Sequence, residues 1–430
     1  MNNKTLCATS RRRLLGAGLA LGGVALSGCA TLGNQASSKP IGRVVVVGGG
    51  YGGSTAARYL KMWGGNIDVT MVERDPTFIS CPISNLVLGG YKKIADVSRG
   101  YGGLSAMGVK VVQGNVTAVD PVAKKVRLAN GSELSYDRLV LSPGIDFMTD
   151  QIPGLQAALD NGRILHSWKA GAQTVALRKQ LEDMPDGGVY ALSIPVAPYR
   201  CPPGPYERAC MVASYFKQAK PKSKVLILDG NPDITSKKAL FMRAWDTHYK
   251  GMIEYRPNAV LKEVAGNTAK LEFEDVKADV LNVVPPQRAG DLARSAGLLN
   301  MNNLWAGVDW LTMESTAVPG IHVLGDSTFS APAMPKSGHM ANQHAKVAAA
   351  AIINLFRGEA VNTSPVVMNT CYSFVTATDV VHVASVHQYV AEEKTFKTVA
   401  GSGGVSAGAN RLEGRYALSW ADNIWNDMLA

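Results

Sequence analysis

The chain has 430 residues, of which 46% are hydrophobic and 18% are charged, and its formal net charge is +10 at pH 7. This length exceeds one ordinary hydrophobic core, so two or three domains are expected, and the composition excludes a mainly disordered chain. Loss of the first 28 residues would remove four basic residues and no acid, which lowers the charge to +6. Because no run of Lys or Arg with interleaved aromatic residues follows, the sequence predicts no nucleic-acid partner.

The first 29 residues have the pattern of an export signal. The sequence SRRRLL at residues 10–15 leads into an apolar run to Leu26, which is shorter than a membrane-spanning helix requires. This pattern is typical of a twin-arginine signal and predicts a periplasmic protein; a short membrane anchor or a buried helix is the less favoured interpretation. Residues 26–29 (LSGC) are similar to a bacterial lipobox. Lipidation of Cys29, which would tether the protein to a membrane, and cleavage near Ala30 to a soluble protein both remain open.

Residues 42–63 predict a strand, a glycine-rich turn and a helix. The run GRVVVV leads into GGGYGG at residues 48–53, and the following ten residues have helical composition. Gly48 allows the tight turn, Gly50 lets the backbone approach a pyrophosphate, and Gly53 lets the helix and the strand pack closely. The phosphates are expected at the N-terminus of the helix.

A second predicted strand, residues 67–72, ends at Glu73, 20 residues after Gly53. A carboxylate at this spacing can bond the ribose hydroxyls, and Arg74 beside it is assigned to the same site. A glycine turn alone is weak evidence. The turn, its flanking strands and the acid together predict a dinucleotide site rather than a turn without a ligand.

Two later segments indicate that this dinucleotide is FAD. Residues 136–144 (YDRLVLSPG) and 321–326 (IHVLGD) are similar to the strand and turn that close the first FAD half, and to the second FAD motif, of two-dinucleotide-domain flavoproteins. In such proteins the aspartate of the second motif accepts a hydrogen bond from a ribityl hydroxyl. Four residues of these segments are assigned to the cofactor: Ser142, Gly144, Gly325 and Asp326.

The predicted fold class is α/β, with two Rossmann-like dinucleotide-binding domains and a C-terminal domain. The chain is expected to leave the FAD domain for an inserted, NADH-like domain with parallel strands near residues 188–194 and 224–229, and then to return. The predicted boundaries are residues 41–153 and 293–360 for the FAD domain, 154–292 for the insert and 361–430 for the C-terminal domain.

The turn after the first strand of the insert lacks a second glycine fingerprint. Five prolines lie between Pro195 and Pro205, and they cannot offer the run of backbone N–H donors that a pyrophosphate needs. We therefore expect no NADH site in this domain. The turn is interpreted as a rigid platform for Cys201, with a plain proline-rich surface loop as the alternative.

Six segments together resemble the flavoprotein subunit of flavocytochrome c sulfide dehydrogenase, and the resemblance covers nearly all of the chain after the signal. The segments are SCPISN at 80–85, RCPPGPYER at 200–208, PPQRAG at 285–290, MPKSG at 334–338, NTCYS at 369–373 and SGGV at 402–405. Three residues of the fourth segment are assigned to the cofactor site: Lys336, Ser337 and Gly338.

The resemblance implies that Cys81 is joined through sulfur to FAD. It implies that Cys201 and Cys371 form a redox-active disulfide beside the flavin, with Glu207 as acid and base. Hydrosulfide would then be oxidised to sulfur or polysulfide, and electrons would pass to a c-type cytochrome subunit with one haem or two. Because the chain has no Cys-x-x-Cys-His, any haem c is expected on that partner only, and no metal site is predicted. Cys210, on a helix predicted to begin near Tyr206, is expected to be an inert buried thiol.

Three alternatives remain at this point. A Cys201–Cys371 bond closing a loop of about 170 residues could be structural, with ~5 kcal/mol of stabilisation from loop entropy. A sulfide:quinone oxidoreductase would share the architecture and the cysteine chemistry, although the tail after Arg415 offers one short segment with Asp422 and Asp427, a poor membrane face. The third alternative is a flavin-binding electron-transfer or sulfur-relay subunit without turnover of its own.

Overall fold

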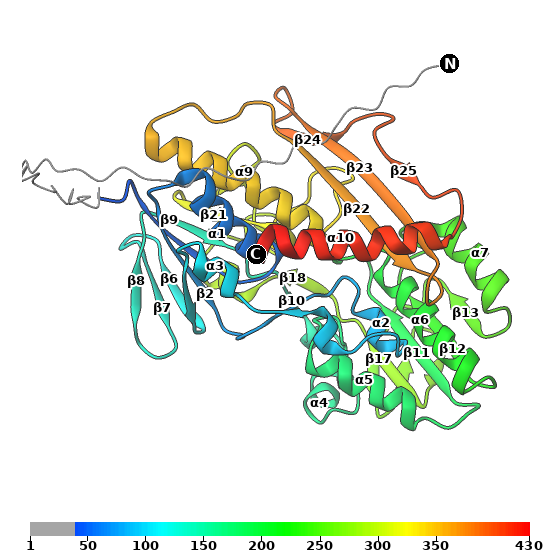
Figure 1. Ribbon diagram of the computed structural model, residues 1–430. Coiled ribbons are helices and arrows are strands. Elements are labelled where there is room, and N and C mark those ends of the chain that lie inside the picture. The colour runs from blue at the N-terminus through cyan, green and yellow to red at the C-terminus, as the bar shows by residue number, and fades with distance from the viewer. Residues whose placement is uncertain (1–38) are drawn as a thin grey trace, which may run out of the picture. The chain divides into compact units, whose positions relative to one another are not determined.

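The structure is a computed structural model that describes residues 39–430 (Figure 1). The predicted export signal and Cys29 lie outside the described residues. The described part contains a seven-stranded sheet, an inserted four-stranded sheet and a C-terminal antiparallel sheet with a long helix. This is the mixed α/β architecture that the sequence predicts.

The seven-stranded sheet has the order β19-β20-β21-β9-β1-β2-β5. Its five strands from β21 to β5 run parallel, and β19 and β20 form an antiparallel edge. In β1 the last four residues of RVVVV are buried, as expected for a parallel strand covered on both faces. The bounds are β1 (Arg43–Val47), β2 (Asp68–Glu73), β5 (Lys110–Gln113), β9 (Arg138–Leu141), β19 (Val308–Asp309), β20 (Glu314–Ser315) and β21 (Ile321–Val323).

Strand β21 lies beside β9, with Ile321 opposite Leu139. The chain therefore leaves this sheet after β9 and returns to it at β21, as the two FAD-like segments predict. The short helix η3 (Gly325–Ser327) follows β21 directly. Asp326 is thus placed at the carboxyl end of the sheet.

Helices α1 (Tyr51–Gly64) and α9 (Gly338–Arg357) pack against each other. Asn342 Nδ2 of α9 donates to Thr55 Oγ1 of α1 at 2.9 Å. Helix α1 starts three residues earlier than predicted, since Gly50 is its extended N-cap residue and the rest of the glycine motif is already helical. The glycine turn is accordingly shorter than its sequence suggested.

Short elements fill the connections of this domain. Strands β10 and β18 pair where the chain enters and leaves the insert. The bounds are β3 (Phe78–Ile79), β4 (Ser98–Arg99), β6 (Val116–Asp120), β7 (Lys125–Leu128), β8 (Glu133–Ser135), β10 (Ile145–Phe147), β18 (Gln287–Ala289), α2 (Asn85–Leu88), α3 (Gly102–Ala106), α8 (Asp291–Ser295), η1 (Ile94–Val97) and η2 (Thr149–Gln151).

The insert is built on a parallel sheet of order β13-β12-β11-β17. The two strands predicted here are β11 (Val189–Ile194) and β12 (Lys224–Asp229), and α6 (Gly204–Ala219) begins two residues before the predicted start at Tyr206. The other bounds are β13 (Ile253–Arg256), β14 (Glu263–Ala265), β15 (Thr268–Lys270), β16 (Asp275–Lys277), β17 (Val280–Val283), α4 (Leu155–Asp160), α5 (Ala172–Asp183) and α7 (Lys238–His248).

The C-terminal residues form an antiparallel sheet and helix α10 (Arg411–Leu429). Cys371 lies on β22. Helix α10 is longer than the segment expected after Arg415, because Asn410 accepts a hydrogen bond from Glu413 N–H and so caps the helix earlier. The strands are β22 (Val366–Phe374), β23 (Val380–Val390), β24 (Thr395–Thr398) and β25 (Gly404–Val405).

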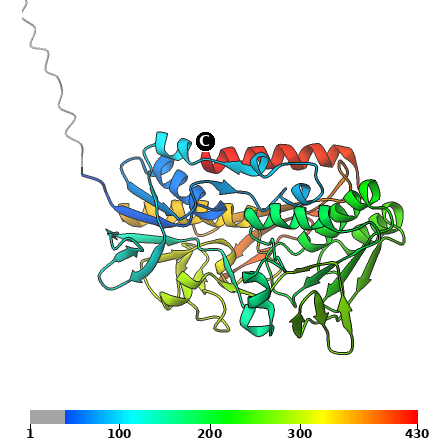
Figure 2. The same ribbon diagram turned by 90° about the horizontal axis from the view of Figure 1, so that it is seen from below.

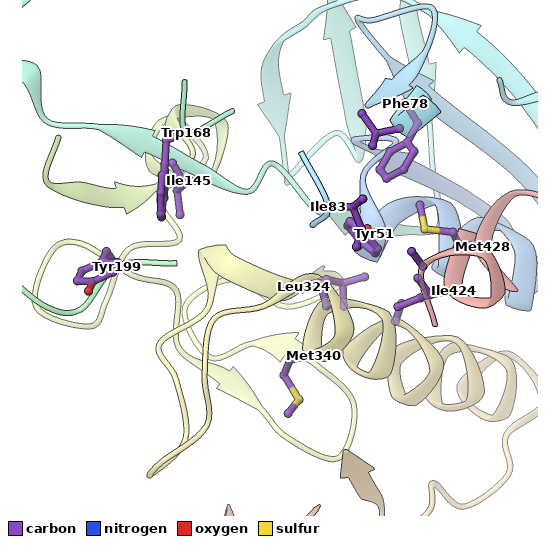
Figure 3. Close-up of a cluster of buried hydrophobic side chains, with 14 of the residues drawn as sticks. Tyr51, Phe78, Ile83, Ile145, Trp168, Tyr199, Leu324, Met340, Ile424 and Met428 are labelled. Carbon is purple, nitrogen blue, oxygen red and sulfur yellow. The ribbon is translucent and has the colours of Figure 1, made fainter. Parts of the chain in front are cut away.

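Helix α10 docks on the FAD half of the protein. Trp425 Nε1 donates to the hydroxyl of Tyr51, the first residue of α1, at 3.2 Å. The close-up in Figure 3 places Ile424 and Met428 of α10 beside Tyr51 and Phe78, and Figure 2 shows the same helix along one edge. The apolar face of α10 is therefore used inside the protein. Within residues 39–430, we find no helix of the length and apolarity needed to cross a bilayer.

Candidate active site

A cavity of about 710 Å³ lies where these elements meet. Its walls come from the glycine turn, the loop around Cys81, the start of α6, the N-terminus of α9 and strand β22. The predicted site residues that line it are Gly50, Glu73, Arg74, Cys81, Ser142, Gly144, Cys201, Glu207, Gly325, Asp326, Lys336, Ser337, Gly338 and Cys371. The structure thus brings together residues from all three parts of the chain.

The three fingerprint glycines occupy the positions that their predicted tasks require. Gly48 has φ +102°, and a Cβ there would lie 2.4 Å from Ser142 O. A Cβ on Gly53 would lie 1.7 Å from Gly48 O, so only glycine permits this strand–helix contact. A Cβ on Gly50, by contrast, would have no protein atom within 4 Å. That open space at the start of α1 suits a pyrophosphate.

Glu73 holds the glycine turn from the end of β2. Its carboxylate accepts hydrogen bonds from Gly49 N–H at 2.5 Å and from Asp75 N–H at 2.9 Å. Arg74 pairs with Asp75 at 3.6 Å and is largely exposed at the cavity edge. Both carboxylate oxygens of Glu73 therefore help to fix the turn, and its ribose contact stays a prediction.

Asp326 presents an unused acceptor to the cavity. Its Oδ1 is buried and has no hydrogen-bond partner among the described residues. Its Oδ2 lies 3.8 Å from Arg200 Nη1. A buried carboxylate oxygen without a donor is costly, so a ligand hydroxyl that donates here would be favoured.

Lys336 is a buried lysine at the turn before α9. Its Nζ donates to Asp326 O at 3.1 Å and to Thr328 O, and it lies 3.8 Å from the ring centre of Trp305. Burial lowers the pKa of Lys336 to about 7, and Asp326 opposes the shift. Next to it, Ser337 accepts from Met340 N–H at 3.0 Å and so caps α9 at the cavity.

Cys81 lies in a tight loop between two donors. Arg200 Nη2 lies 3.2 Å from the Cys81 sulfur, and Ala170 N–H lies 3.4 Å from it. Two residues on, Ile83 has φ +74°, a left-handed conformation that β-branched residues rarely adopt. The chain thus accepts backbone strain to hold the loop beside the cavity.

Cys201 and Cys371 line the cavity from the loop before α6 and from β22, respectively. Cys201 has φ +55°, and its N–H donates to Lys336 O at 2.8 Å. Both are free thiols in the structure, so their pairing stays a prediction. Burial raises the pKa of the Cys201 thiol, and Cys371, which lines the same cavity, raises it further. Cys210 is fully buried in α6, as expected, and burial raises its pKa to about 12.

Glu207 links the start of α6 to the strand that carries Cys371. Its Oε1 accepts from Phe374 N–H at 2.9 Å, and its Oε2 accepts from Asn85 Nδ2 at 2.8 Å. Burial raises the pKa of Glu207, although these two hydrogen bonds oppose the shift. A buried carboxyl group with a raised pKa beside two thiols suits proton transfer.

These features fit FAD. The open turn at Gly50 suits a pyrophosphate, the free oxygen of Asp326 suits a ribityl hydroxyl, and the cavity volume falls in the range of roughly 300–1,000 Å³ that is usual for cofactor sites. The thiols of Cys81, Cys201 and Cys371 lie at the same cavity.

Comparisons with known proteins agree with this arrangement. Residues 42–180 match the family model of pyridine nucleotide-disulphide oxidoreductases, residues 174–285 match the central part of the sulfide dehydrogenase (flavocytochrome c) flavoprotein chain, and residues 363–429 match the flavin-binding part of flavocytochrome c sulphide dehydrogenase. A sulfide dehydrogenase (flavocytochrome c) flavoprotein chain from Chlorobaculum thiosulfatiphilum is 53% identical over 45 residues, which are 10% of this chain and 94% of that sequence. The chain belongs to this flavoprotein family.

More distant relatives of the family align over longer segments. The mitochondrial sulfide:quinone oxidoreductase of Mus musculus is 26% identical over 302 residues, and that of Dictyostelium discoideum is 25% identical over 304 residues. The alignments cover 66% and 67% of this chain, and the chain spans 65% and 66% of the length of those two relatives.

Solved structures show the same fold. The sulfide:quinone oxidoreductase of Aquifex aeolicus has a TM-score of 0.74 at 18% identity, covering 90% of this chain and 92% of that one. An NAD-dependent persulfide reductase from A. fulgidus has a TM-score of 0.63 at 17% identity, covering 90% and 77%.

Sequence reasoning assigned no role to three buried cations of the site. Arg200 contacts both Cys81 and Asp326. Arg208 donates to Asn85 Oδ1 at 3.2 Å and to Asn282 Oδ1 at 2.8 Å, and so joins the Cys81 loop to the insert. Lys237 reaches the backbone of Cys371. Both arginines lie in the family segment at residues 200–208, which was an available signal, whereas Lys237 lies in no motif.

Proposed function

We propose that this protein is the flavoprotein subunit of a sulfide dehydrogenase that oxidises hydrosulfide and passes electrons to a c-type cytochrome subunit. The observation that carries the proposal is the meeting of Cys81, Cys201 and Cys371, from three distant segments, at one cavity suited to FAD. The family that the chain matches, flavocytochrome c sulfide dehydrogenase, supports the same substrate and partner. Haem c would be carried by the partner.

The proposed reaction begins at a disulfide between Cys201 and Cys371. Hydrosulfide attacks one sulfur, which leaves a persulfide on that cysteine and a thiolate on the other. Bound FAD supplies a two-electron acceptor at this position. The added sulfur leaves as elemental sulfur, or a further sulfide extends it to polysulfide. Glu207, buried beside both thiols, takes up the proton of the persulfide at its carboxylate when the added sulfur leaves.

We further propose that Cys81 holds the FAD covalently. Its sulfur is half-buried at the cavity wall, and Arg200 Nη2 and Ala170 N–H both point donors at it. Such donors stabilise a sulfur anion, which is the nucleophilic form of cysteine. The remaining cofactor residues would hold the cofactor as assigned above, with Gly50 at the pyrophosphate and Asp326 at the ribityl chain.

The proposed location is the periplasm. It is supported by the twin-arginine pattern at residues 10–15, and a lipid on Cys29 would tether the protein to the membrane. Cell fractionation of the native protein, with mass spectrometry of its N-terminus, tests both points. Recovery of the unprocessed chain in the cytoplasm alone would contradict them.

A quinone acceptor is the second candidate function. Its support is the name of the mitochondrial relatives and a second cavity of about 410 Å³ between α9 and α10. This cavity shares His339, Tyr372 and Trp420 with the first. Reoxidation of the sulfide-reduced protein by cytochrome c and by a soluble quinone, measured in parallel, decides between them. The main proposal requires the cytochrome to react faster.

Stopped-flow reduction of the flavin by sulfide tests the cysteine chemistry. In Cys201→Ser and Cys371→Ser the flavin should stay bound but should no longer respond to sulfide, because the electrophilic disulfide is gone. Cys210→Ser, whose sulfur is buried in α6 away from the cavity, is the matched control and should react like the wild type. Wild-type rates in both cavity variants would make the bond structural. Absence of reduction in the isolated wild-type protein would favour a subunit without its own turnover.

A further inference from the structure

Lys237 is a buried lysine whose side chain crosses from the insert to the sheet that carries Cys371. It is the N-cap residue of α7, has φ +56° and is only 9% exposed. Its Nζ donates to Cys371 O at 2.9 Å and to Ser373 Oγ at 2.8 Å, and Val381 O lies at 3.5 Å. The ammonium group therefore lies against the backbone of a cysteine that the proposed reaction uses.

All three of these hydrogen-bond partners are neutral. Across residues 39–430, Lys237 has no carboxylate within ion-pair distance, whereas its neighbour Lys238 pairs with Asp233 at 2.6 Å on the surface. A buried ammonium group without an anion is costly, and neutral acceptors offset only part of that cost. The environment of Lys237 is therefore suited to an anion that forms close to it.

The cavity supplies the groups that can become that anion. Burial lowers the pKa of Lys237 to about 8, and Cys371, Glu207, Cys201 and Glu413, in that order, oppose the shift. A lysine with this pKa carries its proton at neutral pH and loses it above about pH 8. Its charge is consequently present when hydrosulfide would react.

The surroundings of Cys371 and Cys201 affect the pKa values of the two thiols differently. Burial raises the pKa of Cys371, but Lys237 is the largest opposing influence, and Asn369 Nδ2, 3.3 Å from the sulfur, lowers it further. For Cys201, burial raises the pKa of the thiol, and Cys371 and Glu207 raise it further. Arg200 and Lys237 lower it by smaller amounts. Glu207 raises the pKa of both thiols, but Lys237 on the backbone of Cys371 and Asn369 beside its sulfur favour a thiolate on Cys371.

We propose that Lys237 is the positioning residue that makes Cys371 the leaving thiolate when hydrosulfide opens the Cys201–Cys371 disulfide. This rests on the proposed function. The sulfur of hydrosulfide bonds to Cys201 Sγ, the Sγ–Sγ bond breaks, and its electron pair goes to Cys371 Sγ. The proton of hydrosulfide stays on the outer sulfur of the Cys201 persulfide, so the step balances without another reactant.

The test uses the reduced holoenzyme and three variants. Lys237→Gln keeps a donor but removes the charge, Lys237→Arg keeps the charge, and Lys238→Gln removes the neighbouring exposed charge as the matched control. Alkylation by iodoacetamide is followed over about pH 6 to 10, and mass spectrometry quantifies Cys371 and Cys201 separately. The other charged groups near the two thiols, Glu207, Arg200 and Arg208, are unchanged in every variant, as is Glu413 near Lys237.

At neutral pH, where Lys237 carries its proton, we expect alkylation of Cys371 to slow about tenfold in Lys237→Gln, which corresponds to a rise of about one unit in its apparent pKa. Lys237→Arg and Lys238→Gln should keep the wild-type rate of alkylation at neutral pH. A Cys371 profile in Lys237→Gln that superimposes on the wild type overturns the proposal. If that variant does not fold, alkylation of the wild type is the test. Cys371 must then be alkylated at lower pH than Cys201, and the reverse order contradicts the proposal that Cys371 is the leaving thiolate.

This readout is separate from turnover. Alkylation needs no sulfide, so a wild-type flavin that sulfide does not reduce would refute the proposed function, whatever the alkylation profiles show. Conversely, if sulfide reduces the flavin but the alkylation profile of Cys371 does not depend on Lys237, the proposed function stands and the proposed role of Lys237 is refuted.

Discussion

Arg200 contacts two residues of the site, Cys81 and Asp326, that belong to different sequence motifs. Its guanidinium lies 3.2 Å from the Cys81 sulfur and 3.8 Å from Asp326, and its backbone N–H donates to Gln287 Oε1 at 3.0 Å. The pKa of Arg200 is raised: burial lowers it, but Cys81, Asp326 and Cys201 together outweigh that effect. One side chain therefore places a positive charge beside both the cysteine proposed to attach the flavin and the aspartate proposed to bind the ribityl chain.

The first prediction concerns Cys81. Serine cannot form the thioether, so Cys81→Ser should release its flavin on acid precipitation, whereas the wild-type flavin should stay with the precipitated protein. The measurement is the flavin absorbance of the supernatant and of the redissolved pellet. Cys210→Ser should behave like the wild type, because that sulfur does not reach the cavity. Release of the wild-type flavin by acid would refute covalent attachment.

The second prediction concerns Glu207 and pH. Because burial raises the pKa of Glu207, its carboxyl group keeps a proton at pH values where a free glutamate has lost it. The rate of flavin reduction by sulfide, measured at fixed hydrosulfide concentration, should therefore show an ionisation above the ordinary range of glutamate. Glu207→Gln should lose this ionisation and slow the step by ~10²–10⁴-fold. Exposed Glu182→Gln is the control, and an unaltered profile in Glu207→Gln would exclude proton transfer at this group.

At the scale of elements, we expect two glycines of the β1–turn–α1 unit to have different roles: Gly53 is needed for folding, and Gly50 is needed for cofactor binding. A Cβ at Gly53 would meet Gly48 O at 1.7 Å, but at Gly50 it would meet no protein atom within 4 Å. Gly53→Ala should lower the melting temperature markedly and abolish flavin incorporation, because strand and helix must separate. Gly50→Ala should keep the wild-type melting temperature of the flavin-free protein and reduce flavin content. Equal thermal unfolding of both variants would contradict this division.

The sequence predicted this unit well because its information is local. The β-branched run of β1, the glycine spacing and Glu73 all lie within one stretch of chain, and each matches a single structural requirement. The full length of α10 was not predicted, since the cap is made by Asn410 and Glu413, and Asn410 lies beyond a Gly/Ser-rich loop. Element boundaries depend on such caps more than on apolar periodicity.

At the scale of the whole molecule, the site depends on contacts between segments distant in sequence. Glu207 of the insert holds β22 through Phe374 N–H, and Lys237 holds it through Cys371 O. No spacing rule connects Lys237 with Cys371, so the pairing is visible only in the structure. The cysteines themselves were predictable because each lies in a dense local motif that resembles a known family.

The last prediction concerns the insert. It has the fold of a nucleotide-binding domain, but backbone donors of the turn after β11 are bonded to other groups of the protein. After β11 the backbone N–H of Ala197 donates to Asn231 Oδ1 at 2.9 Å, that of Arg200 to Gln287 at 3.0 Å and that of Cys201 to Lys336 O at 2.8 Å. The prolines among them have no N–H to offer. Because these three donors are used inside the protein and the prolines have none, the turn offers no run of free N–H groups to a pyrophosphate, so NADH should neither bind tightly nor reduce the flavin. Stopped-flow mixing with NADH should leave the flavin spectrum unchanged, while dithionite bleaches the same sample as a control; rapid bleaching by low concentrations of NADH would show that the insert still works as a nucleotide domain.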